Sequence, residues 1–143
     1  MKRSLILSAL AASTFASLVV AQAQKEKQVV YVNSAEASYN PAPGSSGAKM
    51  HTLRGNPEKG SHATFTKFDP GYDAGMHTHT NDVSLVVIKG AYLYKDDAGE
   101  KRVGPGEYIS IPGGHKHWSG GDKTEGALFY QEGAGMFDLI PAK

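Results

Sequence analysis

The stretch GYDAGMHTHTNDVSLVVIKG, residues 71–90, places two of the chain's six histidines one residue apart, just before an apolar run. Residues two apart in a strand point to the same side of a sheet, so His77 and His79 can present both imidazoles to one point. Neighbouring coordination positions of a metal ion require that arrangement. One such pair is weak as a signal, because exposed histidine pairs are common.

A second pair, His115 and His117, makes the signal stronger, because four of the six histidines now lie in two tight pairs. His115 shares the strand parity of His117. It is therefore a fourth ligand, an acid/base group near neutral pH, or an exposed loop residue. His51 and His62 lie outside both pairs and are expected to be ordinary surface residues.

Short strands separated by glycine-rich turns follow one another along the chain. Turns are predicted at residues 96–99 and 104–106, and strands at residues 63–68, 83–88, 91–95, 108–111, 127–131 and 136–140. This spacing indicates an all-β sandwich or barrel. Residues 29–32 predict one more short strand, whereas the rest of 24–56 contains a Pro/Gly/Ser-rich loop and is expected to be loosely ordered.

The run 83–88 is apolar on both strand faces, which predicts a strand that is covered on both sides. The second cover is either the N-terminal segment or another subunit. A homodimer is therefore one of two expectations.

The N-terminus has the pattern of a Sec-type signal peptide: a basic start, a short apolar stretch and a small-x-small site at residues 21–23. Cleavage after Ala23 leaves a domain division of 1–23 signal peptide, 24–56 extension and 57–143 barrel. We expect a periplasmic or secreted protein with no membrane association after cleavage. The alternative, an uncleaved anchor, has an apolar stretch that is short and diluted by Ser and Thr.

The composition excludes several classes of function. Without Lys2 and Arg3 the remaining 120 residues carry 13 basic and 14 acidic side chains, so no basic field is available to bind nucleic acid. The chain has no cysteine, which excludes disulfides, thiolate ligands and cysteine nucleophiles.

Two motifs in order resemble those of the cupin superfamily. The pattern G-x5-H-x-H-x3-x-x6-G fits residues 71–90, and G-x5-P-x-G-x2-H fits residues 106–117, with fifteen residues between them. Beyond the motifs, the chain is similar to small single-domain cupins akin to the metal-binding domain of anti-sigma factors. The resemblance implies a jelly-roll barrel, with His77, His79 and His117 as metal ligands.

The chain departs from the usual motifs at two positions. Val83 stands where a glutamate ligand is usual, and Gly121 stands where asparagine is frequent. After a bulge, Asp82 could supply the missing carboxylate. Trp118 either walls the pocket or packs at its rim.

The resemblance implies a divalent transition metal, with iron(II) and zinc favoured and manganese, nickel and copper open. Such a site resembles the three-histidine iron sites of thiol and diketone dioxygenases. The expected function is therefore an exported metal-binding cupin. It is either a dioxygenase acting on a small organic substrate, with His115 as acid/base group, or a non-catalytic metal- or small-ligand-binding or sensing protein.

Overall fold

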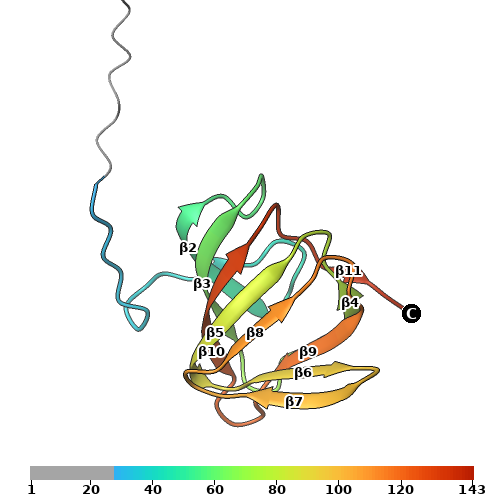
Figure 1. The fold of residues 1–143 in the computed structure, drawn as a ribbon. Coiled ribbons are helices and arrows are strands. Elements are labelled where there is room, and N and C mark those ends of the chain that lie inside the picture. Colours follow the sequence, from blue (N-terminus) through green and yellow to red (C-terminus); the bar gives the residue numbers. More distant parts are fainter. Residues whose placement is uncertain (1–27) are drawn as a thin grey trace, which may run out of the picture.

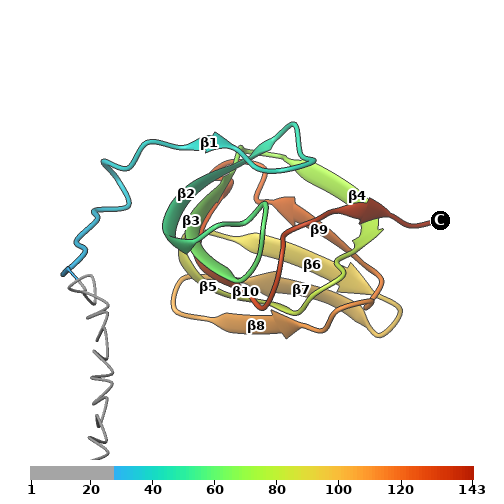
Figure 2. The ribbon, with the colours of Figure 1, turned by 90° about the horizontal axis from the view of Figure 1, so that it is seen from above.

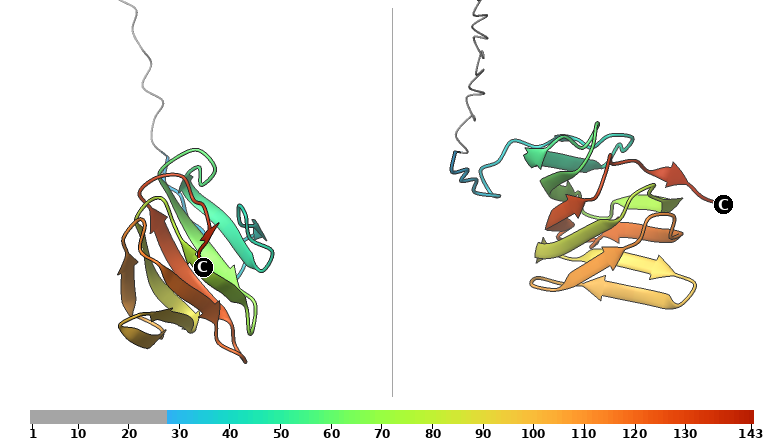
Figure 3. Two further views of the ribbon diagram at one scale, coloured as in Figure 1. Left: turned by 90° about the vertical axis from the view of Figure 1, so that its right-hand side faces the viewer. Right: turned by 45° about the horizontal axis from the view of Figure 1, so that its top comes forward.

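A computed structural model describes residues 28–143 of the chain, which contain eleven strands and no helix. The strands form two antiparallel sheets that face each other (Figure 1; Figure 3). The all-β prediction is confirmed, but hydrogen bonds do not close the two sheets into one barrel. Within these residues, nothing is long and apolar enough to cross a membrane as a helix. The predicted signal peptide lies outside the described residues.

The larger sheet has six strands, and the predicted strands at 63–68, 83–88, 108–111 and 127–131 all belong to it. In spatial order it contains β1 (Asn40–Pro41), β2 (Ala48–Gly55), β3 (His62–Phe68), β10 (Ala127–Gly133), β5 (Val83–Gly90) and β8 (Tyr108–Ile111).

The smaller sheet has five strands, and two of them, β4 and β9, carry His77 and His117 (Figure 2). Its strands β6 and β7 form a hairpin that is connected by the predicted turn at residues 96–99. In spatial order the sheet contains β11 (Ile140–Pro141), β4 (Asp73–Thr78), β9 (His117–Gly121), β6 (Tyr92–Asp96) and β7 (Gly99–Val103).

Alternation along the strands sends one set of side chains between the sheets, where they form the core. Leu85 and Val87 of β5 pack there with Phe129 of β10 and Tyr92 of β6. Gly90 ends β5 with a φ of +71°, and a Cβ at this position would overlap the carbonyl oxygen of Gly126. The motif glycine is therefore required by both backbone conformation and space.

The interior changes from apolar to polar along the strands. Near one end, Phe68 pairs with Ala127, while toward the other end the inner positions are Thr64, paired with Gln131, and His62, paired with Gly133. Thr64, Gln131 and His62 are all at most 3% exposed. The site described below lies at this polar end of the interior.

Three N- and C-terminal predictions differ from the structure. Residues 29–32 form no strand, and Val29 is 98% exposed because nothing packs against it. Residues 48–55, which the sequence assigns to the extension, form β2, because Ala48 and Met50 alternate into the core. The strand predicted at 136–140 shrinks to Ile140–Pro141.

The outer face of β5 is not covered within the described residues. Ser84 and Val86 are half-buried and Ile88 is 41% exposed. The N-terminal segment does not provide the predicted cover, because β1 and β2 lie at the far edge of the same sheet (Figure 2). A second subunit as the cover stays a prediction.

Candidate metal centre

Three histidines meet between the sheets at the polar end of the interior. His77 on β4 and His117 on β9 are register partners, and His79 follows β4 directly. One ligand nitrogen of each lies within 4.8 Å of the others. The ring centroids of His77 and His117 are 4.3 Å apart, and His79 lies 4.9 Å from His77. The structure therefore brings together the three residues that the sequence predicted as ligands.

Backbone carbonyl groups fix the tautomer of each imidazole. His77 Nδ1 donates to Gly75 O at 2.8 Å, His79 Nδ1 to Asp138 O, and His117 Nδ1 to His115 O at 3.0 Å. A carbonyl oxygen only accepts hydrogen bonds, so each Nδ1 carries the proton and each Nε2 keeps a free lone pair. This is the second-sphere arrangement that orients histidine ligands in metal sites.

Burial keeps the three rings uncharged. Desolvation lowers the pKa of His77 and of His79 below the usual value, and it lowers the pKa of His117 to about 4. All three are therefore neutral at pH 7 without a competing proton on the ligand nitrogen. Neutral imidazole is the form that binds a metal ion.

A second observation indicates that the three imidazoles fit a transition metal ion. His117 Nε2 is fully buried and has no hydrogen-bond partner among residues 28–143. A buried nitrogen without a partner costs free energy, so it needs a compensating group. A metal ion held by three imidazoles supplies that compensation, and imidazole suits zinc, copper, iron and nickel.

A small cavity of about 20 Å³ lies beside His77 and His79, which line it together with Gln131, with the hydroxyl-bearing Ser45, Thr66 and Ser119, and with mostly apolar side chains. Val83 is one of these apolar side chains and is 5% exposed. The position of the usual glutamate ligand is thus inside the site but carries a side chain that cannot bind metal.

The C-terminal segment completes the site, which the sequence did not indicate. Asp138 accepts hydrogen bonds from the amide of Thr80, at 2.8 Å, and from its hydroxyl, while its carbonyl holds His79. The ring of Phe137 packs 5.3 Å from that of His79. No motif marks these residues, because they join the site only through contacts 58 and more residues along the chain.

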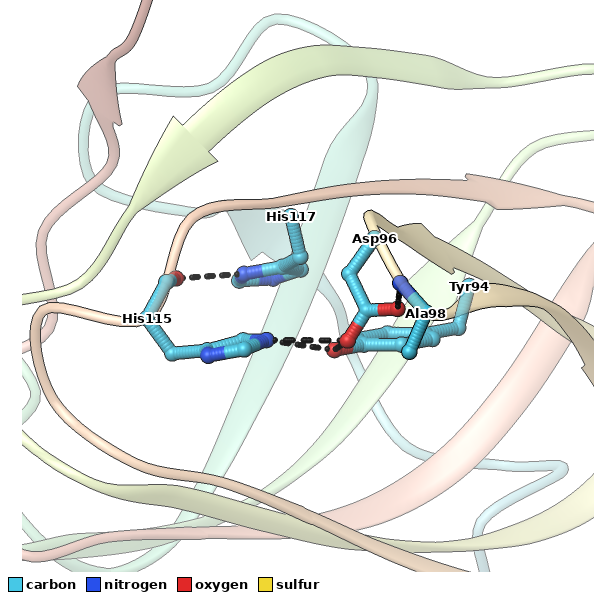
Figure 4. Close-up of polar contacts among 5 residues, drawn as sticks. All are labelled: Tyr94, Asp96, Ala98, His115 and His117. Carbon is cyan, nitrogen blue, oxygen red and sulfur yellow. Dashed lines mark hydrogen bonds and ion pairs between the residues drawn. The ribbon is translucent and has the colours of Figure 1, made fainter.

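His115 lies next to the three imidazoles but is not one of the cluster. Its side chain is 42% exposed, and its Nε2 lies 3.0 Å from Asp96 Oδ2 and 2.9 Å from Tyr94 Oη (Figure 4). Its ring stacks on that of His117 at 6.4 Å. The structure therefore does not make it a fourth ligand, and the acid/base role remains a prediction.

Tyr94 lies beside His115, and the rings of both residues stack on the buried ring of His117 (Figure 4). Its ring stacks on His117 with centroids 5.5 Å apart, and its hydroxyl donates to Asp96 Oδ2 at 2.7 Å. Burial, together with that carboxylate, raises the pKa of Tyr94 far above its usual range. Tyr94 therefore stays a neutral phenol that donates to Asp96.

Two candidate residues lie outside the cluster. Asp82 is exposed, and its Oδ1 accepts a hydrogen bond from the amide of Gly113 at 2.8 Å, so it does not replace the glutamate ligand. Trp118 does not wall the pocket, because it follows the inward-facing His117 and points to the outer face of β9. There its Nε1 donates to Asp73 Oδ1 at 2.6 Å.

The prediction that His62 is a surface residue is wrong. It is 2% exposed at the inner face of β3, where Gly133 on the neighbouring strand leaves room for the ring. Its Nδ1 donates to Gly135 O at 3.0 Å. His51 is half-buried, and its Nδ1 lies 2.9 Å from Ser38 O.

Comparisons with known proteins agree with this geometry. A family model described as the ChrR cupin-like domain matches residues 27–134. No curated protein sequence matches the chain significantly.

Solved structures show the same fold at low sequence identity. The polyketide cyclase RemF from Streptomyces resistomycificus matches with a TM-score of 0.66 and 19% identity, over 81% of this chain and 87% of that one. A proposed acetylacetone dioxygenase from Methylibium petroleiphilum matches at 0.61 and 18%, over 82% and 84%. KdgF from a Halomonas species matches at 0.57 and 19%, over 74% and 94%.

Proposed function

Because the chain belongs to the family of ChrR cupin-like domains, we propose that His77, His79 and His117 hold one divalent transition metal ion. The supporting observation is the buried Nε2 of His117, which has no partner within the described residues and lies in a cluster of neutral imidazoles. Iron(II) and zinc are the favoured ions, and manganese, nickel and copper are compatible with imidazole ligands.

As the finer function we propose a non-haem dioxygenase that acts on a small chelating organic substrate. When bound, the ion supplies Lewis-acid and redox chemistry. Three uncharged ligands do not neutralise its charge, which favours an anionic or chelating substrate. One similar structure is that of a proposed acetylacetone dioxygenase. His115 is the candidate acid/base group, with its Nε2 held by Asp96.

A second candidate is a non-catalytic cupin that binds or senses a metal or small ligand, and the size of the cavity favours it. About 20 Å³ is room for roughly one water molecule. Any organic substrate in this space therefore requires the segment around Phe137 and Leu139, which lines the cavity, to move.

Metal content and thermal stability test the metal site. Iron(II), zinc, manganese, nickel or copper is added in turn to the metal-stripped protein. We expect one ion per chain, and about 2.7 kcal/mol of stabilisation at a free concentration 100 times Kd. His77→Ala and His117→Ala should lose this stabilisation. His51→Ala, which removes an imidazole outside the cluster, should keep it. Absence of stoichiometric metal and of any stabilisation would overturn the proposal.

Oxygen consumption separates the two candidate functions. The iron(II)-loaded protein is mixed with small diketones and thiol carboxylates in an oxygen electrode. Substrate-dependent uptake that is lost in His77→Ala supports the dioxygenase. Tight zinc binding without uptake for any substrate supports the binding or sensing protein.

We also propose that the protein is exported to the periplasm or secreted. The supporting feature is the pattern of residues 1–23. Sequencing of the mature N-terminus tests it: a chain that begins at Gln24 is expected, and one that begins at Met1 in the cytoplasm contradicts export.

A further inference from the structure

Three buried nitrogen atoms in residues 28–143 have no hydrogen-bond partner: His62 Nε2, His117 Nε2 and Gln131 Nε2. The bound metal ion proposed above accounts for the nitrogen of His117. Gln131 is different, because its amide nitrogen is a donor and cannot bind a metal. Its side chain is 3% exposed, so solvent does not satisfy it either.

The position of Gln131 shows where a partner must lie. Its strand, β10, pairs with both β3 and β5, and Gln131 stands opposite Thr64 and Leu85 on the inner face. Its side chain lines the same small cavity as His77 and His79. The side chain that carries the unsatisfied donor therefore adjoins the space beside His77 and His79.

A neighbouring polar pair shows that the interior can satisfy such groups when it has a partner for them. Thr64 and Thr66 are at most 1% exposed, and their hydroxyl oxygens lie 2.9 Å apart in a hydrogen bond. Gln131 has no comparable protein partner for its nitrogen. A leucine or methionine would fill this position without the cost of an unpaired amide.

We propose that Gln131 is a ligand-positioning residue: its amide nitrogen donates a hydrogen bond to a small acceptor ligand held in the cavity beside His77 and His79. The ligand class is set by the space, which accommodates one water-sized molecule or the end of a small linear anion. The inference rests on the proposed metal site, because the metal ion holds the other side of the ligand.

Azide binding to the cobalt(II)-loaded protein tests this proposal, with the visible spectrum as readout. Azide is a narrow anion whose terminal nitrogen accepts a hydrogen bond. Gln131→Met keeps the length of the side chain and removes the donor. We expect its azide Kd to rise about tenfold, the effect of one lost hydrogen bond, while its cobalt affinity is unchanged. Gln131→Leu should show the same loss of azide affinity.

The metal-free proteins give a second readout. Removal of an unpaired buried amide should raise the melting temperature of Gln131→Met by about 4 °C. The matched control is Thr64→Val, which breaks the buried Thr64–Thr66 hydrogen bond at a residue outside the cavity lining. It should lower the melting temperature and leave azide affinity unchanged.

The outcomes separate the two proposals. Wild-type protein that binds no cobalt overturns the metal site, and this inference with it. Cobalt bound equally by wild type and Gln131→Met, with equal azide affinity, overturns the role of Gln131 alone. A lower melting temperature of metal-free Gln131→Met would show that the amide has a partner inside the protein, which also overturns it.

Discussion

Acid should destabilise the metal-free protein through the buried imidazoles. The pKa of His117 is about 4 in the folded chain, against an ordinary value of 6.5. As pH falls below 6.5 the unfolded chain binds a proton that the folded chain cannot accept, so stability falls until the pH reaches about 4. For His117 alone the loss between pH 7 and pH 5 is about 2 kcal/mol. The pKa values of His77 and His79 are also lowered, which adds loss in the same direction.

Urea denaturation of the metal-stripped protein at pH 7, 6 and 5 measures this effect. For a domain of this size, a loss of about 2 kcal/mol in the free energy of unfolding also corresponds to a melting temperature that is lower by roughly 8 °C. His117→Asn removes the titrating group, so its stability should depend less on pH by about 2 kcal/mol over this interval. His51→Asn should keep the full loss. Equal pH dependence in wild type and His117→Asn would refute the reasoning.

Three further substitutions test other parts of the site and the outer sheet. Val83→Glu places a carboxylate in the cavity beside the imidazoles, so zinc affinity measured by calorimetry should rise about tenfold or more while the metal-free protein loses stability. His115→Asn should leave zinc affinity within about twofold, because the ring is outside the cluster, while any substrate-dependent oxygen uptake falls. Val86→Lys should convert the expected homodimer to monomer in light scattering, since Val86 pairs with Tyr130 and Tyr108 on the outer face of β5; a monomeric wild type contradicts the dimer.

The histidine cluster was predictable in two steps. Strand parity places His77 and His79 on one side, and the resemblance to the second cupin motif implies His117 as the third ligand. The structure adds only that β4 and β9 are neighbours, which makes His77 and His117 register partners. The strands at 83–88 and 108–111 were equally visible, because each is a short run rich in apolar residues between turn signals.

Other residues of the site were not predictable, because sheet pairing alone brings them in. Gln131 reads as one polar residue in an apolar strand until β10 is known to lie between β3 and β5. Asp138 and Phe137 reach His79 from a segment with little regular structure. The burial of His62 depends on Gly133, a residue that is distant in sequence and informative only once the register is known.

The polar end of the interior connects stability with function. Eight polar side chains are buried there or next to it, and three of their nitrogen atoms lack a partner within the described chain. A sequence selected only for folding would place apolar side chains at these positions, since each unpaired nitrogen costs about 1–3 kcal/mol. The chain contains no cysteine, so no disulfide offsets that cost. A metal ion bound to His117, together with a ligand hydrogen-bonded to Gln131, would recover this free energy. We therefore expect metal binding to stabilise the folded chain as well as to supply chemistry.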